Sequence, residues 1–138
     1  MGVRFISVQM HPVPMAYEFT YQTFDGLRGA SGDAFNGILD DLIPRGEEII
    51  AAYRSGRGGA VFTARRAIAI DAKGITGKQK VVTVVPYSKV SAYAFEGASI
   101  RSFDGKLTLW NRGIGTITFA FEDRTDLGRI ATALADGS

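Results

Sequence analysis

The sequence holds few of the side chains from which enzymes build catalytic sites. It contains no cysteine, and its single histidine, His11, lies next to Pro12. The usual base of a Ser–His–Asp or Cys–His arrangement is therefore missing beside any motif of the predicted domain. A chain so poor in imidazole and thiolate groups is also poor in ligands for transition metals. We predict no catalytic residue, no metal site and no cofactor.

Carboxylates that are adjacent in the sequence are the remaining candidates for acid–base chemistry. Consecutive residues of a strand point to opposite faces, so adjacent carboxylates do not converge on one substrate. They also flank the ends of the predicted strands and helices. We interpret them as solvated end residues and predict that the protein is not an enzyme. The pairs are Asp40–Asp41, Glu47–Glu48 and Glu122–Asp123.

Positive charge is concentrated in the middle of the chain. The net charge is +2, but residues 54–80 alone hold seven basic side chains and one acidic side chain. Arginine and lysine bind anions, and glycines let backbone N–H groups approach a phosphate group. The alternative is that these side chains only solvate the turns between strands. The candidates for anion or lipid binding are Arg54, Arg57, Arg65, Arg66, Lys73, Lys78 and Lys80.

The N-terminal residues are not predicted to be a targeting signal. They are interrupted by Arg4, His11, Pro12 and Pro14. No stretch of the sequence approaches the roughly 18–20 apolar residues that a membrane-spanning helix needs. We therefore expect a cytoplasmic protein without a membrane-spanning segment. A membrane surface is a partner only in the alternative function given below, and nucleic acid is not expected as a partner. Met15 offers an alternative start to the chain.

Aromatic side chains form a second set of candidates. Trp110 is out of phase with Leu107 and Leu109, so it is predicted to face away from the core unless the same chain covers it. Other aromatic residues alternate with small or polar ones, as on a half-buried strand. Because exposed aromatic side chains are typical of interfaces, the interface candidates are Trp110, Tyr93, Phe95, Tyr17, Phe19 and Tyr21.

The elements that position these side chains are predicted to be strands. After Gly46 the sequence becomes a succession of short runs with alternating apolar residues, separated by Gly, Asp, Lys and Pro. No gap between them is long enough for the crossover that parallel strands need, so the sheet is predicted to be antiparallel. Asp104-Gly105 predicts a tight hairpin. The seven runs are residues 47–54, 60–63, 65–71, 80–87, 89–96, 106–110 and 115–121.

Two helices are predicted beside this sheet. A short helix over residues 35–42 has Ser31 or Asp33 as its cap and ends before Pro44. A C-terminal helix presents a stripe of Leu127, Ile130, Ala131 and Leu134, with Asp123 as its cap and Gly137 as its stop, and closes the sheet. We divide the chain into an N-terminal extension, residues 1–30, which is an arm or an extra strand, and a domain over residues 31–138.

Residues 61–96 carry three sequence blocks in a specific order. The first is Val61-Phe62-Thr63 with Arg66. The second is Asp71 with Gly74, Thr76, Gly77 and Lys78, and the third is Pro86-Tyr87 with Val90. In this order and spacing the chain resembles the short bacterial pleckstrin-homology (PH) domain family, over roughly residues 40–135.

The resemblance implies a mainly β, PH-like fold, a seven-stranded antiparallel barrel or roll closed by a C-terminal helix, with a short N-terminal helix. It also implies a symmetric, ring-shaped homo-oligomer. The family usually has an F-D-x-D-x-E-L run where this chain has residues 102–107, without the second and third acidic residues. The resemblance therefore does not extend to the subunit contact of those carboxylates.

Two functions follow from these patterns. The favoured one is a non-enzymatic, self-assembling protein–protein interaction module, whose partner is itself or an unidentified protein. The alternative is a domain that binds anions or the headgroups of an anionic membrane surface through the basic segment.

Overall fold

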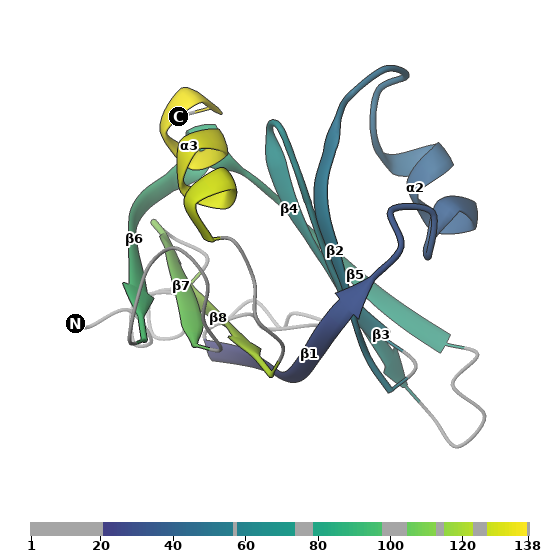
Figure 1. Ribbon diagram of the computed structural model, residues 1–138, viewed down its shortest axis with the longest axis horizontal. Helices are drawn as coiled ribbons and strands as arrows, with labels where there is room; N and C mark the ends of the chain where they lie inside the picture. Colours follow the sequence, from purple (N-terminus) through teal and green to yellow (C-terminus); the bar gives the residue numbers. More distant parts are fainter. Residues whose placement is uncertain are drawn as a thin grey trace, which may run out of the picture.

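The computed structural model describes residues 21–56, 58–73, 79–97, 105–112, 115–122 and 127–137, except for the side chains of Tyr21 and Lys73. One curled sheet of eight strands forms the body of the molecule (Figure 1). Its order is β5-β4-β3-β2-β1-β8-β7-β6, so β5 and β6 are its two edges. The strands are β1 (Tyr21–Ala30), β2 (Ile49–Ser55), β3 (Gly58–Thr63), β4 (Arg66–Lys73), β5 (Gln79–Pro86), β6 (Val90–Glu96), β7 (Lys106–Asn111) and β8 (Gly115–Phe121).

The seven predicted runs are strands β2 to β8, and the eighth strand, β1, comes from the segment predicted to be an arm or an extra strand. β1 lies at the centre of the sheet, antiparallel to β2 and parallel to β8. The parallel pair contradicts the prediction of an all-antiparallel sheet. The prediction considered only strands that follow one another, whereas β1 and β8 have most of the chain between them, which supplies the crossover.

Apolar side chains fill the inner side of the curl. Phe62 packs edge-on against Phe119, with ring centroids 5.0 Å apart. The C-terminal helix α3 (Leu127–Gly137) lies across this side, as Figure 1 shows. Its Leu127, Ile130 and Leu134 are buried as predicted. Ala133 is buried as well, whereas Ala131 is half-buried. The helix therefore closes the curl with the three predicted leucine and isoleucine side chains, and Ala133 takes the place of Ala131 in the buried stripe.

A second, smaller core lies on the outer side of β2 to β5, under the short helix α2 (Asn36–Leu42). Phe35 and Leu39 pack there against Val61 and Ile68. The predicted cap of this helix is wrong, because Phe35 occupies the N-cap position without a side-chain hydrogen bond. Ser31 donates its hydroxyl hydrogen bond to Asp33 instead. β3 is therefore buried on both faces.

The two connections of the edge strand β6 differ in length. A 3-10 turn, η1 (Tyr87–Lys89), joins β5 to β6. β6 and β7 pair from Glu96 and Lys106, so their connection is longer than the two-residue turn predicted at Asp104-Gly105. The two edge strands β5 and β6 are thus consecutive in the chain and diverge from η1 to opposite ends of the sheet order (Figure 1).

Replacement of Gly59 by alanine is expected to lower the free energy of unfolding by about 1–3 kcal/mol. A methyl group there would meet the carbonyl oxygen of Tyr53 and lie 2.9 Å from Cζ of Phe35. Gly32→Ala is the matched control, because a methyl group at Gly32 would meet nothing within 4 Å. Urea unfolding should place the control within about 0.5 kcal/mol of the parent protein. An unchanged stability for Gly59→Ala would contradict this packing.

Candidate functional site

The described basic candidates are divided between two ends of the sheet. Arg54 and Lys80 lie where β2 ends and β5 begins, and Lys73 is the last residue of β4 at the same end. Arg65 and Arg66 lie at the turn between β3 and β4, at the other end. The intervening strand β3 spans roughly 17 Å, at about 3.3 Å per residue. These residues therefore do not form one patch.

Arg54 and Lys80 line one open pocket of about 390 Å³, together with Phe35 and Gly56. The guanidinium group of Arg54 lies over the Phe35 ring, with Cζ 4.9 Å from the ring centroid. It also donates from Nη2 to the carbonyl oxygen of Ala34, at 3.2 Å. Both contacts hold the charge of Arg54 beside the pocket, so this end of the sheet can present an arginine and a lysine to a small anion.

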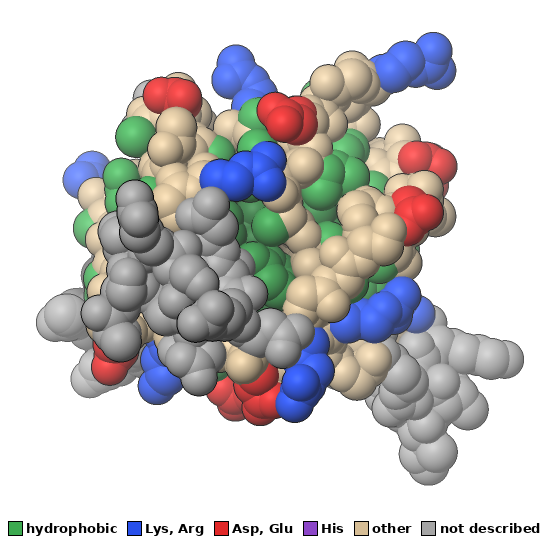
Figure 2. Space-filling model, viewed as in Figure 1, with side chains coloured by type: hydrophobic (Ala, Val, Ile, Leu, Met, Phe, Trp, Pro, Cys, Tyr) green, Lys and Arg blue, Asp and Glu red, His purple; other side chains and the backbone are tan. Residues whose placement is uncertain are grey.

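Acidic side chains lie close to this basic pair. The adjoining pocket, of about 410 Å³, is lined by Asp25 and Asp71 and shares Gly56 with the first pocket. On the face shown in Figure 2, blue and red side chains are interspersed around the rim. Opposite charges at short range reduce the attraction of a surface for anions. The positive excess of the sequence is therefore not a single positive surface on this face.

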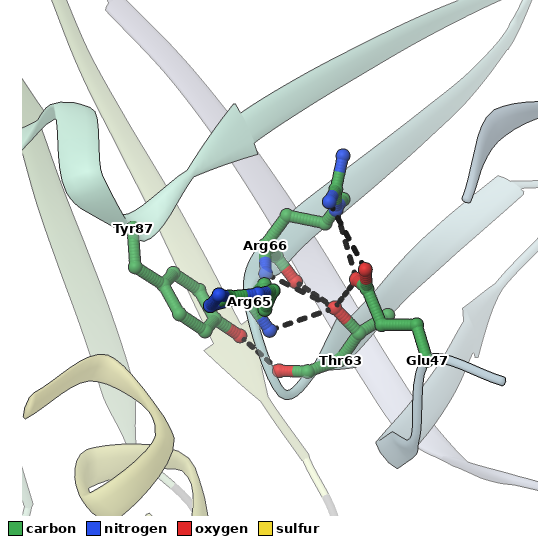
Figure 3. Close-up of polar contacts among 5 residues, drawn as sticks. All are labelled: Glu47, Thr63, Arg65, Arg66 and Tyr87. Atoms are coloured by element: carbon green, nitrogen blue, oxygen red, sulfur yellow. Dashed lines mark hydrogen bonds and ion pairs between the residues drawn. The ribbon is translucent and has the colours of Figure 1, made fainter. Parts of the chain in front are cut away.

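A polar network closes the opposite end of β3 (Figure 3). Glu47 precedes β2, and its carboxylate accepts two hydrogen bonds from Arg66, from Nε at 2.8 Å and from Nη2 at 3.0 Å. The same carboxylate accepts a hydrogen bond from the Thr63 hydroxyl. The Thr63 oxygen accepts from the backbone N–H groups of Arg65 and Arg66, at 3.1 and 3.0 Å. The side chain of Glu47 is only 5% exposed, which strengthens these charge-assisted bonds.

Tyr87 extends the network to η1 and to the end of α3. Its hydroxyl donates to the carbonyl oxygen of Thr63 at 2.8 Å, and its backbone N–H donates to the carbonyl oxygen of Arg65 at 2.9 Å. Burial, and then the negative charge of Glu47, raises the pKa of Tyr87 above its ordinary value, so the phenol stays a hydrogen-bond donor. Gly137 packs on the Tyr87 ring, where a methyl group would lie 2.9 Å from Cδ2.

This network gives a structural role to three residues of the sequence blocks. Thr63 and Arg66 of the first block and Tyr87 of the third meet at one place. Because Arg66 forms an ion pair with Glu47, the position of Arg66 does not support its predicted role in anion binding. The interpretation of Glu47 as a solvated end residue is wrong, whereas Glu48 is exposed and lies 4.0 Å from Arg129. The pairing of Ile49 with Thr63 places Glu47 beside the turn between β3 and β4.

Arg65, the other basic residue at this turn, is exposed. It lines an open pocket of about 610 Å³ with Arg45, Glu48 and Asp136. With Arg66 and Glu47, three arginines and three carboxylates line this opening, so it has no net charge to attract an anion. This pocket therefore offers no clear preference for a charged ligand.

The aromatic candidates that the structure describes lie on or beside the edge strand β6. Tyr93 and Phe95 form an edge-to-face pair with ring centroids 5.9 Å apart. Tyr93 is 39% exposed, and Phe95 is half-buried against the inner core. Trp110 is half-buried and lies on the face opposite to Leu107 and Leu109, both fully buried, as its phase predicts.

Several predicted residues lie outside the described part of the chain: His11, Tyr17, Phe19, Arg57, Asp123 and Lys78. Nothing is described of the side chains of Tyr21 and Lys73, which lie on strands β1 and β4. Within the described residues, no group of three or more His, Cys, Asp or Glu side chains could hold a metal ion. The helices among these residues are too short or too polar to cross a membrane.

Comparison with known proteins supports the resemblance found in the sequence. A family model described as "Bacterial PH domain" matches residues 28–137. The chain is also similar to YjqA, an uncharacterized protein of Bacillus subtilis (strain 168). The two are 34% identical over 93 residues, which cover 64% of this chain and 74% of YjqA.

Solved structures show the same fold. One of them is a DUF1696 family protein with a pleckstrin-homology domain from Shewanella loihica PV-4, with a TM-score of 0.59 and 27% identity. The matched region covers 83% of this chain and 98% of the Shewanella loihica chain. A pleckstrin homology domain from Shewanella amazonensis SB2B has a TM-score of 0.54 and 24% identity, with 96% of each chain covered. The predicted PH-like fold is confirmed, with eight strands in place of seven.

Replacement of Glu47 by alanine is expected to lower the free energy of unfolding by about 2–4 kcal/mol, because it leaves Arg66 and Thr63 without their buried partner. Glu48→Ala removes the same charge from the next residue, which is exposed, and should cost about 0.5 kcal/mol or less. Urea unfolding of both variants measures the difference. Equal stabilities would show that the network does not hold the turn.

Proposed function

The chain belongs to the bacterial PH domain family, and we propose that it is a non-enzymatic, cytoplasmic interaction module whose partner is another copy of itself. The proposed contact lies at the edges of the sheet, β5 and β6, rather than in a pocket. The support comes from the backbone and side chains of these two strands.

The exposure of β6 carries this proposal. The four consecutive residues Ser91 to Ala94 are all exposed, on both faces of the strand. An edge strand presents unpaired N–H and C=O groups, and proteins usually protect such edges with lysine, proline or a bulge. The sequence of β6, VSAYAFE, contains neither lysine nor proline and places two aromatic side chains at this edge. Its one irregularity lies at the start of the strand, between Val90 and Ala92, and the pairing from Ala92 to Glu96 is regular. Such a strand is suited to pairing with another chain.

The other edge, β5, is protected at its ends but apolar between them. Its sequence, QKVVTVVP, has Lys80 near the start and Pro86 as the last residue, and the residues between them are mainly valine. Its valines are half-buried, apart from Val85, which is buried. Strands rich in β-branched residues pair readily, and two different edges on one molecule allow copies to join head to tail. Head-to-tail contacts close into a ring when the rotation between copies is right, which agrees with the oligomer that the family resemblance implies.

Size-exclusion chromatography with light scattering is expected to give a mass several times the 14.8 kDa of one chain. Tyr93→Lys should reduce this mass at micromolar concentration, because a lysine at an edge resists pairing. Thr132→Lys adds the same charge to the exposed side of α3 and should leave the mass unchanged. A parent protein that stays monomeric at these concentrations would rule out self-assembly as its function.

A second candidate function is the binding of small anions or anionic headgroups at the pocket of Arg54 and Lys80. The observation in its favour is that the structure brings these two residues of the predicted basic set to one opening. The nearby Asp25 and Asp71 weaken it, because they lie at the same end of the sheet. We therefore rank this function below self-assembly.

If this second function is correct, the protein will co-sediment with vesicles of phosphatidylglycerol and phosphatidylcholine at low salt and be released at moderate salt. Arg54→Gln should then weaken binding roughly fivefold, as expected for the loss of about 1 kcal/mol at one basic residue. Arg129→Gln removes an equal charge from α3 and should change binding little. No sedimentation of the parent protein with anionic vesicles would eliminate a membrane-surface role.

A further inference from the structure

We propose that β6 of one copy pairs antiparallel with β5 of the next, in the register that places Glu96 opposite Lys80. This inference rests on the proposed self-assembly and adds which edges meet and in which alignment. It is argued from the face that each side chain occupies, from the charges at the strand ends and from the side-chain pairs that result.

The faces of β5 follow from its pairing with β4. Lys80, Val82 and Val84 pair with Ala72, Ile70 and Ile68. Val82 and Val84 pack against the outer core, so these three residues share the outer face. Since successive side chains alternate, Val81, Thr83 and Val85 share the inner face, and Val85 belongs to the inner core.

The faces of β6 follow from its pairing with β7. Tyr93 and Phe95 pair with Leu109 and Leu107, which are fully buried in the inner core. Ala92 and Ala94 therefore occupy the outer face, together with Glu96. Each edge thus presents one outer row that ends in a charge, positive on β5 and negative on β6.

An antiparallel alignment with Glu96 opposite Lys80 matches both rows at once. On the outer face it places Ala94 opposite Val82 and Ala92 opposite Val84, so that small side chains meet branched ones. On the inner face it places Phe95 opposite Val81 and Tyr93 opposite Thr83. Aromatic and β-branched residues are favourable cross-strand partners, and so are opposite charges.

Other alignments lose one of these matches. A shift by one residue places the outer row of one copy against the inner row of the next, because the side-chain period of a strand is two. A shift by two residues in one direction places Glu96 opposite Val82, and in the other direction Lys80 opposite Ala94. A parallel arrangement brings Glu96 to the Pro86 end of β5, away from Lys80. The proposed alignment alone satisfies the faces and the charges.

The consequence is a sheet that continues from one copy to the next. The inner and outer apolar layers would both extend across the contact, and the half-buried valines of β5 would become covered. Since the two surfaces differ, the contact is head to tail, and each copy keeps one edge of each kind for a further neighbour.

Cysteine cross-linking tests the alignment, and the chain has no cysteine of its own. Val82→Cys protein mixed with Ala94→Cys protein is expected to give a reducible dimer under mild oxidation, because directly opposite residues meet the geometry of a disulfide. Val82→Cys mixed with Ser91→Cys is the control. Ser91 is exposed on the same strand but lies three residues, roughly 10 Å, from Ala94, so at least tenfold less dimer is expected.

Charge exchange gives a second, independent measurement. Lys80→Glu and Glu96→Lys should each weaken assembly roughly fivefold by placing like charges opposite each other. The double variant with both substitutions should recover the mass of the parent protein. Recovery is not expected if either substitution acts only by disturbing the fold of its own strand.

The outcomes separate this inference from the proposed function. A multimer by light scattering without the Val82–Ala94 cross-link would preserve self-assembly and overturn the alignment. A cross-link within Val82→Cys protein alone, or within Ala94→Cys protein alone, would show like edges meeting and would also overturn it. A monomeric parent protein would overturn both.

Discussion

The carboxylate of Glu47 joins the start of β2 to the turn between β3 and β4. It accepts hydrogen bonds from Arg66 and Thr63 across the turn between β3 and β4. The carbonyl oxygen of Thr63 in turn accepts a hydrogen bond from the Tyr87 hydroxyl. Tyr87 is the first residue of η1, the short joint between the two edge strands. The position of this joint decides where β5 ends and β6 begins. One nearly buried carboxylate therefore helps, through Thr63 and Tyr87, to fix the point at which β5 ends and β6 begins.

The two helices complete this arrangement without covering the edges. α3 closes the inner side of the curl, and its last residue, Gly137, rests on the ring of Tyr87. α2 covers the outer side of β2 to β5 through Phe35 and Leu39. Both helices pack on faces of the sheet, because that is where the apolar rows lie. Among the described residues, hydrogen bonding along β5 and β6 is satisfied on one side only, since each has a single neighbour in the sheet order.

The sequence predicts the strands well because most of them bury one row of side chains, a pattern visible within a single run. It also predicts the C-terminal stripe of Leu127, Ile130 and Leu134. It cannot predict that β1 enters between β2 and β8, because that pairing depends on contacts between distant segments. The sequence cannot predict the role of Glu47 for the same reason, since the hydrogen-bond partners of Glu47 are 16 and 19 residues away in the chain. Nearness in sequence groups the basic residues into one set. In the structure β3 runs between them, so Arg65 and Arg66 lie at the end of the sheet opposite to Arg54 and Lys80.

The edges of the sheet, rather than the sequence blocks, are therefore the better candidates for the functional surface. Thr63, Arg66 and Tyr87 are engaged inside the molecule, so these three residues of the sequence blocks maintain the shape of this domain. At one end of β3 a basic opening adjoins an acidic one, and the opening at the other end is lined by both signs of charge. The edges differ from these openings because a strand without a second neighbour offers an ordered row of donors and acceptors whatever its side chains. Side chains then need only select the partner and its alignment, which a charge at one end and matched apolar rows can do.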